Sequence, residues 1–189
     1  MNTSTDKGRL LTTLARGAIA HAFGQTFQRP PLPEWMYQPG ATFVTLTQGD
    51  ALRGCIGTLE AHRPLVDDLE HNARAAAFDD PRFPAMSEAE LDRTRVEVSI
   101  LSKPEQMHFT DEVDALAQLR PGVDGVILEA GWLRATFLPQ VWEQIPRPAE
   151  FMAHLKRKAG LAIDYWSEDV RLSRYTVEKY KEDLKEETS

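Results

Sequence analysis

Proline positions restrict the folding of this chain more than any other feature of its sequence. Proline fixes one backbone angle and cannot donate a backbone hydrogen bond, so it is excluded from helix interiors and central strands. Four of the twelve prolines lie within residues 28–40, which we therefore expect to form an extended connector. Three more stand where a predicted helix begins or ends, at Pro64, Pro81 and Pro148.

Apolar residues recur at helical spacing in the segments between these prolines. The pattern predicts amphipathic helices over residues 8–24 and 64–79. A short helix is predicted over residues 112–119, and a longer one begins at Pro148 and ends at Gly160. A shorter helical turn is predicted directly after Ser87, because Ser87 and Glu90 have the spacing of a capping box.

Turn residues join most of the predicted strands into hairpins. Residues 42–47 and 51–59 form one hairpin around a Gln-Gly-Asp turn, and residues 126–128 and 133–137 form another. Hairpins, in place of regular βαβ units, indicate an α/β fold of the α+β type. In such a fold, helices pack on a mostly antiparallel sheet.

Two further segments complete the predicted sheet. Alternation of apolar and polar residues predicts single strands over residues 96–100 and 170–177. The charged tail that follows, residues 178–189, is expected to fray at its end. The length of 189 residues corresponds to one domain, or to two small subdomains that share a core.

The charge balance argues against two classes of partner. The chain carries 29 acidic and 22 basic residues, and this formal net charge of −7 repels phosphate backbones and acidic membrane surfaces. We therefore expect no nucleic-acid binding and no membrane binding.

A single cysteine, Cys55, excludes an intramolecular disulfide and gives no sign of an oxidising compartment. The N-terminus lacks the apolar segment of a signal peptide, and no apolar run approaches the roughly 20 residues of a membrane span. These observations predict a cytoplasmic protein. Cys55 has no metal-binding spacing with other residues, so the sequence predicts no metal site and no cofactor.

Four segments resemble one known family: Leu52-Arg53-Gly54-Cys55-Ile56-Gly57, Asp80-Pro81-Arg82-Phe83-Pro84, Phe137–Trp142 and Leu155–Leu161. In this order, within residues 8–180, they resemble the AMMECR1 domain, which in bacteria is also called AmmeMemoRadiSam system protein A. The resemblance implies a two-subdomain α/β fold, with a cleft between the subdomains close to the Arg53-Gly54-Cys55 segment.

The resemblance also implies genomic company with a Memo-like protein and a radical-SAM protein, which are therefore expected partners. It implies no known reaction. Many bacterial relatives carry cysteine where this chain has Lys156, so Cys55 is the only thiol on which chemistry could depend here.

Cys55 and Arg53 are the candidate catalytic residues. Residues two apart on a regular strand share a face, so the guanidinium is expected beside the thiol, where it would favour the reactive thiolate. Gly54 and Gly57 would leave the backbone open to a ligand and are candidate ligand-binding residues. The alternative is a small buried cysteine, with glycines that permit a bulge or a tight crossing.

Asp80, Arg82 and Lys158 are the other candidate ligand-binding residues. Asp80 and Arg82 flank a proline in a loop, where the arginine could bind a carboxylate or phosphate in bidentate fashion. The two could instead hold each other or cap a helix. Lys158 precedes a predicted helix end at Gly160, where it either interacts with the helix dipole or donates to an anionic ligand.

Three functions stay open on these observations. The first is a role in a modification pathway with the Memo-like and radical-SAM partners. The second is a small enzyme that uses Cys55 and Arg53 in a cleft on an anionic small molecule. The third is a non-catalytic adaptor that binds proteins through Trp35, Met36 and Tyr37 of the proline-rich connector.

Overall fold

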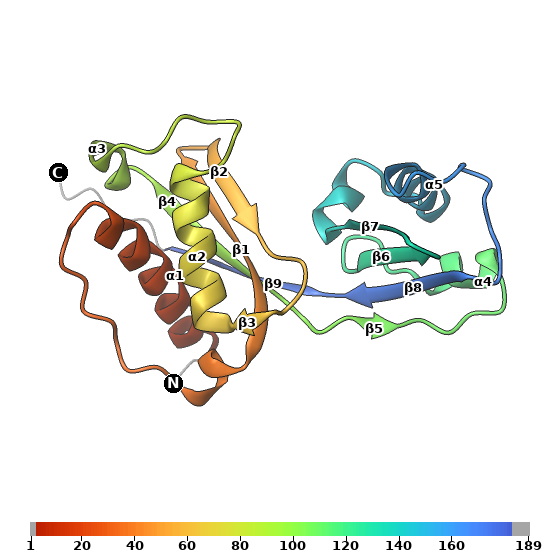
Figure 1. Ribbon diagram of the computed structural model, residues 1–189, viewed down its shortest axis with the longest axis horizontal. Helices are drawn as coiled ribbons and strands as arrows, with labels where there is room; N and C mark the ends of the chain where they lie inside the picture. The colour runs from red at the N-terminus through yellow and green to blue at the C-terminus, as the bar shows by residue number, and fades with distance from the viewer. Residues whose placement is uncertain (1–2, 183–189) are drawn as a thin grey trace. The chain divides into compact units, whose positions relative to one another are not determined.

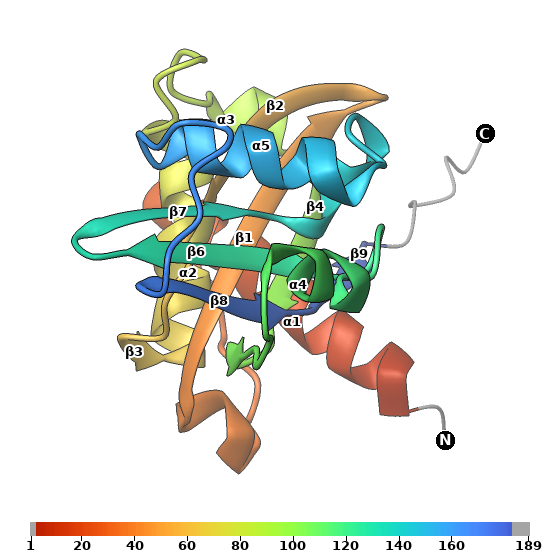
Figure 2. The same ribbon diagram turned by 90° about the vertical axis from the view of Figure 1, so that its right-hand side faces the viewer.

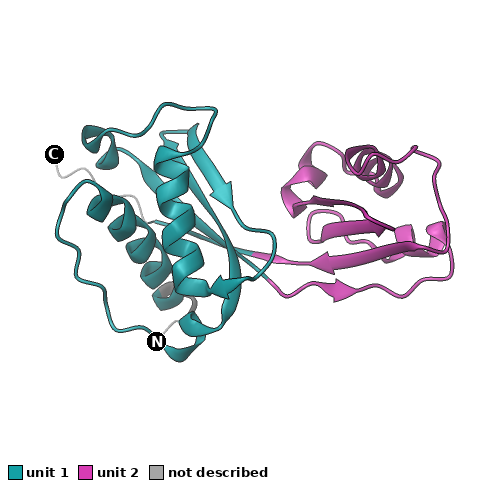
Figure 3. Ribbon diagram, in the orientation of Figure 1, with its two compact units in different colours: residues 1–101, 178–189 teal, residues 102–177 magenta. Residues whose placement is uncertain are grey.

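Two units, each with its own sheet and its own core, make up residues 3–182, the part of the chain that the computed structural model describes (Figure 3). The first unit contains the residues up to 101 and takes up the chain again at residue 178, and the second contains residues 102–177.

The first unit packs two long helices on one face of its sheet (Figure 1). The strand order is β2–β1–β4–β9, with β2 and β4 antiparallel to β1 and a short β3 paired with the beginning of β1. The helices are α1 Thr3–Ala22 and α2 Leu65–Phe78, and two short turns are η1 Glu34–Tyr37 and α3 Glu88–Leu91. The strands are β1 Pro39–Gln48, β2 Ala51–Gly57, β3 Arg63–Pro64, β4 Arg95–Leu101 and β9 Val177–Lys181.

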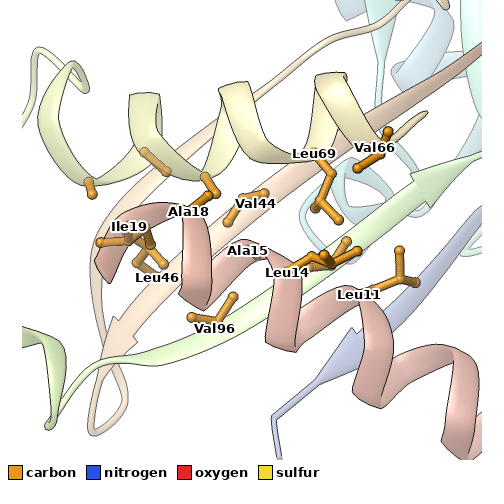
Figure 4. Close-up of a cluster of buried hydrophobic side chains, with 14 of the residues drawn as sticks. Leu11, Leu14, Ala15, Ala18, Ile19, Val44, Leu46, Val66, Leu69 and Val96 are labelled. Atoms are coloured by element: carbon orange, nitrogen blue, oxygen red, sulfur yellow. The ribbon is translucent and has the colours of Figure 1, made fainter. Parts of the chain in front are cut away.

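The core of this unit fills the space between the helices and the sheet (Figure 4). Apolar residues recur every three or four positions in α1 and every second position in β1, so each element turns one apolar face inward. Seven completely buried side chains from four elements meet here: Leu11, Leu14, Ile19, Val44, Leu46, Leu69 and Val96.

The second unit packs helix α5 against a sheet of order β5–β8–β6–β7 (Figure 2). The ring of Phe151 in α5 stacks on that of Trp142, with centroids 3.7 Å apart, and the Trp142 indole donates to the Asp124 carbonyl at 2.7 Å. The strands are β5 Glu105–Gln106, β6 Gly125–Ala130, β7 Leu133–Phe137 and β8 Val170–Tyr175. The helices are α4 Glu112–Gln118, η2 Pro139–Glu143 and α5 Pro148–Lys158.

The structure confirms the predicted α+β class with antiparallel sheets. Four of the predicted helices correspond to α1, α2, α4 and α5, and the two predicted hairpins to β1–β2 and β6–β7. The predicted capping box at the start of α3 is present, with Ser87 and Glu90 bonded to each other's backbone.

The strand predicted over residues 170–177 is confirmed for residues 170–175, but its last part is wrong, because the segment contributes to two sheets. β8 ends at Tyr175 in the sheet of the second unit, and β9, which starts at Val177, belongs to the sheet of the first unit. The first residues of the charged tail, 178–181, belong to β9. The remainder of the tail, residues 183–189, lies outside the described residues.

The proline-rich connector contains the turn η1, and this alters the surface predicted there. Met36 is completely buried in the core of the first unit, so it is not part of a contact surface. Trp35 and Tyr37 are exposed by 36% and 57%. The predicted three-residue surface is therefore reduced to these two aromatic side chains.

Glu182 joins the end of β9 to the rest of the first unit. Its carboxylate accepts hydrogen bonds from Arg16 Nε at 2.6 Å, from Arg16 Nη2 at 2.7 Å and from the Val96 backbone at 2.9 Å. Arg16 also donates to the carbonyls of Leu91 and Thr94. One partly buried ion pair thus connects α1, the end of α3, β4 and the chain after β9.

We expect Glu182→Gln to lower the free energy of unfolding by about 2 kcal/mol, because it removes a charged acceptor of several hydrogen bonds. Glu178→Gln is the matched control, since Glu178 is 62% exposed and its pair with Lys7 should contribute less than about 1 kcal/mol. Urea unfolding of both variants measures the difference. Equal losses would contradict the role assigned to Glu182.

Candidate functional site

A β-bulge interrupts β2 at Arg53. In the ladder with β1, Gly54 lies opposite Leu46 and Leu52 lies opposite Thr47, which leaves Arg53 as an extra, unmatched residue. The rule that residues two apart share a face holds only for an unbroken strand. The prediction that the Arg53 guanidinium lies beside the Cys55 thiol is therefore wrong, and the two side chains contact different groups.

Arg53 is buried and binds the segment that follows α2. Its Nε donates to Glu90 Oε1 at 2.8 Å, and its Nη2 donates to the Pro84 carbonyl at 3.0 Å. The hydrogen bond from Arg53, supported by the Ser87 backbone amide, holds the pKa of Glu90 well below its usual range. Glu90 is thus an ionised, half-buried partner for the guanidinium, and Arg53 acts on the loop rather than on the thiol.

Asp80 is the second point at which this loop is fixed to β2. Its carboxylate, only 4% exposed, accepts from the Cys55 backbone amide at 2.9 Å and from Arg82 Nε and Nη2 at 3.0 and 2.7 Å. The bonds from Arg82, and then those from the two backbone amides, outweigh burial and hold the pKa of Asp80 well below its usual range.

Arg82 is the arginine that lies next to Cys55. Its Nη2 lies 3.3 Å from the Cys55 carbonyl oxygen, and its side chain stays 54% exposed although Asp80 holds it. The ring of Phe83 lies between the two arginines, with its centroid 5.6 Å from Cζ of Arg82 and 5.9 Å from Cζ of Arg53. The structure therefore brings together Cys55, Asp80 and Arg82.

The Cys55 thiol lies on the face of the sheet that points away from the helices. Cys55 pairs with Thr45, whose neighbours on β1 are buried against the helices, so alternation turns both side chains to the opposite face. The thiol is partly exposed and lies 3.3 Å from the Thr45 hydroxyl. Among residues 3–182, the hydrogen bonds of Cys55 to side chains involve Thr45, Asp80 and Arg82 but no histidine.

Packing accounts for both glycines of the motif. A Cβ at Gly54 would lie 2.1 Å from the Ala76 carbonyl oxygen, so glycine is needed for α2 to approach β2. A Cβ at Gly57 would lie 2.2 Å from the Phe43 ring. Neighbouring groups thus fill the space that was predicted to be open to a ligand, and a ligand-binding role for either glycine stays a prediction.

Lys158 belongs to the second unit and has structural contacts there. Its ammonium donates to the Thr136 carbonyl at 2.9 Å and lies 5.1 Å from the centre of the Phe137 ring. These contacts connect the last turn of α5 to β7. A role for Lys158 in binding an anion stays a prediction.

A buried polar network beside the motif was missed from the sequence. The completely buried Asp68 of α2 accepts from the Thr42 backbone at 2.9 Å and from the Thr58 hydroxyl at 2.8 Å, and Asn72 donates to it at 3.0 Å. It fixes the chain just after β2. The available signal was that Asp68 and Asn72 fall among the apolar positions of the helix, where an unpaired polar group would be costly.

Residues 3–182 contain neither a metal-binding cluster nor a membrane-spanning helix. No three His, Cys, Asp or Glu side chains there are grouped so that they could hold a metal ion. None of the helices in this part of the chain is both long and apolar enough to cross a membrane.

Comparison with known proteins gives consistent matches over nearly the whole chain. A sequence profile of the AMMECR1 family matches residues 12–180. A protein of Methanothermobacter thermautotrophicus is 41% identical over 185 residues, covering 95% of this chain and 96% of the relative. One from Thermotoga maritima is 42% identical over 153 residues, covering 79% and 83%.

A solved structure is also similar. The crystal structure of the uncharacterized protein PH0010 from Pyrococcus horikoshii superposes with a TM-score of 0.79 at 34% sequence identity, covering 95% of this chain and 93% of that one.

Because Arg53 and Asp80 fix the loop of residues 79–87 to β2, we expect Arg53→Lys to make this loop more mobile. Lysine keeps the charge but cannot reach Glu90 and the Pro84 carbonyl with one planar group. We expect faster amide hydrogen exchange in this loop and a loss of about 2 kcal/mol of stability. Arg29→Lys, at an exposed pair with Glu70, is the control. Unchanged exchange in the loop would contradict this assignment.

The lowered pKa values of Asp80 and Glu90 predict how stability depends on pH. A carboxyl group whose pKa is lower in the folded state stabilises that state above its unfolded pKa, about 4, and loses the contribution as pH falls below it. We expect Asp80→Asn to be less stable than the wild type at pH 7 and to lose less stability between pH 5 and pH 2. Asp67→Asn, at an exposed position of α2, is the control in acid unfolding. Parallel curves for wild type and Asp80→Asn would rule the contribution out.

Proposed function

Because the chain belongs to the AMMECR1 family, we propose that it acts in the cytoplasm as one component of a modification pathway, together with Memo-like and radical-SAM partner proteins. Its own part in this pathway is to bind an anionic small molecule or anionic group at Arg82, next to the Cys55 thiol. The observation that carries the binding role is a guanidinium that is fixed by a buried carboxylate and yet half exposed.

The hydrogen bonds of Arg82 support this role. Asp80 takes the Nε–Nη2 edge of the guanidinium, and the Cys55 carbonyl lies near the remaining Nη2 hydrogen. Among the described residues, Nη1 has no hydrogen-bond partner, so its two hydrogens can donate to a carboxylate or phosphate. Since Asp80 already fixes the side chain, a ligand would lose less affinity to ordering it.

Binding is better supported than catalysis by the thiol. A cysteine nucleophile usually has a general base within hydrogen-bond reach. Among the described residues, the thiol itself hydrogen-bonds to the Thr45 hydroxyl, whereas Asp80 and Arg82 bind the backbone amide and carbonyl of Cys55. A small enzyme that uses Cys55 therefore stays the second proposal, and in it Arg53 would be a positioning residue.

An adaptor role has a separate basis in η1. Trp35 and Tyr37 are exposed aromatic side chains on a turn whose Met36 is fixed in the core. Exposed aromatic residues are enriched at protein interfaces. In this reading the partner contacts Trp35 and Tyr37, and replacing both with serine should abolish its co-purification with the chain.

The binding role predicts how Cys55 reacts with charged reagents. Arg82 should favour the anionic reagent iodoacetate over the neutral iodoacetamide, and Arg82→Gln should lower the ratio of their rates about fivefold, as expected for about 1 kcal/mol between unit charges in water. Mass spectrometry follows the reaction at the single cysteine, and Arg29→Gln is the control. An unchanged ratio, or a thiol that reacts with neither reagent in the folded protein, would refute the proposal.

A further inference from the structure

A pocket of about 570 Å³ lies within the second unit, far in sequence from the Cys55 motif. It is formed by two segments, residues 106–111 after β5 and residues 166–171 before and at the start of β8. Its volume is within the range of about 300–1,000 Å³ that is usual for small-molecule sites.

The pocket arises where two paired segments separate. β5 pairs with β8 through Gln106 and Ser173, and the Met107 amide then donates to the Leu172 carbonyl at 2.8 Å. No further backbone hydrogen bond joins residues 108–111 to residues 166–171. The space between them therefore begins where the backbone pairing ends.

The inner surface of the pocket is apolar and partly aromatic. Met107 and Val170, which line it, are 6% and 5% exposed. Phe109 and Trp166 also line it, and their ring centroids lie 5.5 Å apart with the planes tilted by 54°. Aromatic and apolar walls of this kind bind flat rings well.

The buried Lys156 fixes one of these walls. Its side chain is 1% exposed, and its ammonium donates to Glu112 Oε1 at 2.5 Å and to the Ile163 carbonyl at 3.2 Å. The same ammonium lies 5.4 Å from the centre of the Trp166 ring. Because a cation already occupies one face of the indole, the ring attracts a second cation only weakly, which argues against a cationic ligand.

The rim of the pocket supplies polar groups of both charges, and its two carboxylates are Asp111, which accepts from the Asp114 amide at 2.8 Å, and the exposed Glu168. Arg171 lines it, is exposed, and has no ion-pair partner among residues 3–182, whereas Glu129, opposite it in the ladder, pairs with Arg134. The exposed His108 also lines the rim. Arg171 is therefore available to bind an anion in bidentate fashion at the rim of a pocket that two aromatic rings also line.

We propose that this pocket binds a small molecule that combines a flat ring with an anionic group. The ring lies against Phe109 and Trp166, and the anionic group binds Arg171. Nucleoside monophosphates and aromatic carboxylates share this chemistry. The proposal is independent of the binding role assigned to Arg82, since the two sites have no residue in common.

Isothermal titration calorimetry of the full chain tests the proposal with AMP and with 4-hydroxybenzoate. Adenosine, which lacks the anion, and inorganic phosphate, which lacks the ring, are the ligand controls. We expect AMP or 4-hydroxybenzoate, or both, to bind with a Kd below about 1 mM. Whichever of them binds should bind more tightly than adenosine and inorganic phosphate do. The probe with the lower Kd shows whether the natural ligand is a nucleoside monophosphate or an aromatic carboxylate.

Variants locate the binding. Arg171→Gln should weaken it about tenfold, as expected for the loss of a charge-assisted hydrogen-bond pair, while Arg157→Gln, an exposed charge on α5, should leave it unchanged. Trp166→Leu should weaken it further, with thermal unfolding as the check on folding. The inference is overturned if neither probe binds, or if binding survives Arg171→Gln. It is also overturned if Arg82→Gln abolishes the binding, since the ligand then occupies the other site.

Discussion

Burial of the Arg53 guanidinium is the constraint on which the site of the first unit depends. The bulge in β2 turns this side chain inward, and a buried cation must be paired to be tolerated. Glu90 supplies the charge, and since Glu90 also caps α3, pairing fixes that turn and the loop before it. The position of Asp80 and Arg82 beside Cys55 then follows from how the loop returns to β2.

Stability alone does not explain an arginine at this position. Its Nη1 is buried without a hydrogen-bond partner among the described residues, and leaving such a group unsatisfied costs about 1–3 kcal/mol. Buried ion pairs can often be replaced by apolar residues without loss of stability. We infer that Arg53 is valuable because it fixes the geometry of residues 80–84, which an apolar side chain could not do.

Local patterns were sufficient to predict most of the fold. Helical spacing and proline positions predicted α1, α2, α4 and α5, and turn residues predicted both hairpins. They could not reveal that the segment around Thr176 passes from one sheet to another, because alternation continues on both sides of it. Nor could they reveal the bulge at Arg53, since a bulge depends on the partner strand, and so the wrong arginine was assigned to Cys55.

The motif Leu52–Gly57 separates into residues that the fold requires and residues that it does not. Arg53 holds the loop, Gly54 and Gly57 admit Ala76 and Phe43, and Ile56 packs against the core. Leu52 is 41% exposed, and the thiol of Cys55 is directed away from the helices and partly exposed. A serine or alanine would satisfy the backbone at position 55 equally well, because Asp80 binds only its amide. The thiol is thus the part of the motif whose presence calls for a functional explanation, and the half-exposed Arg82 lies at the carbonyl of the same residue.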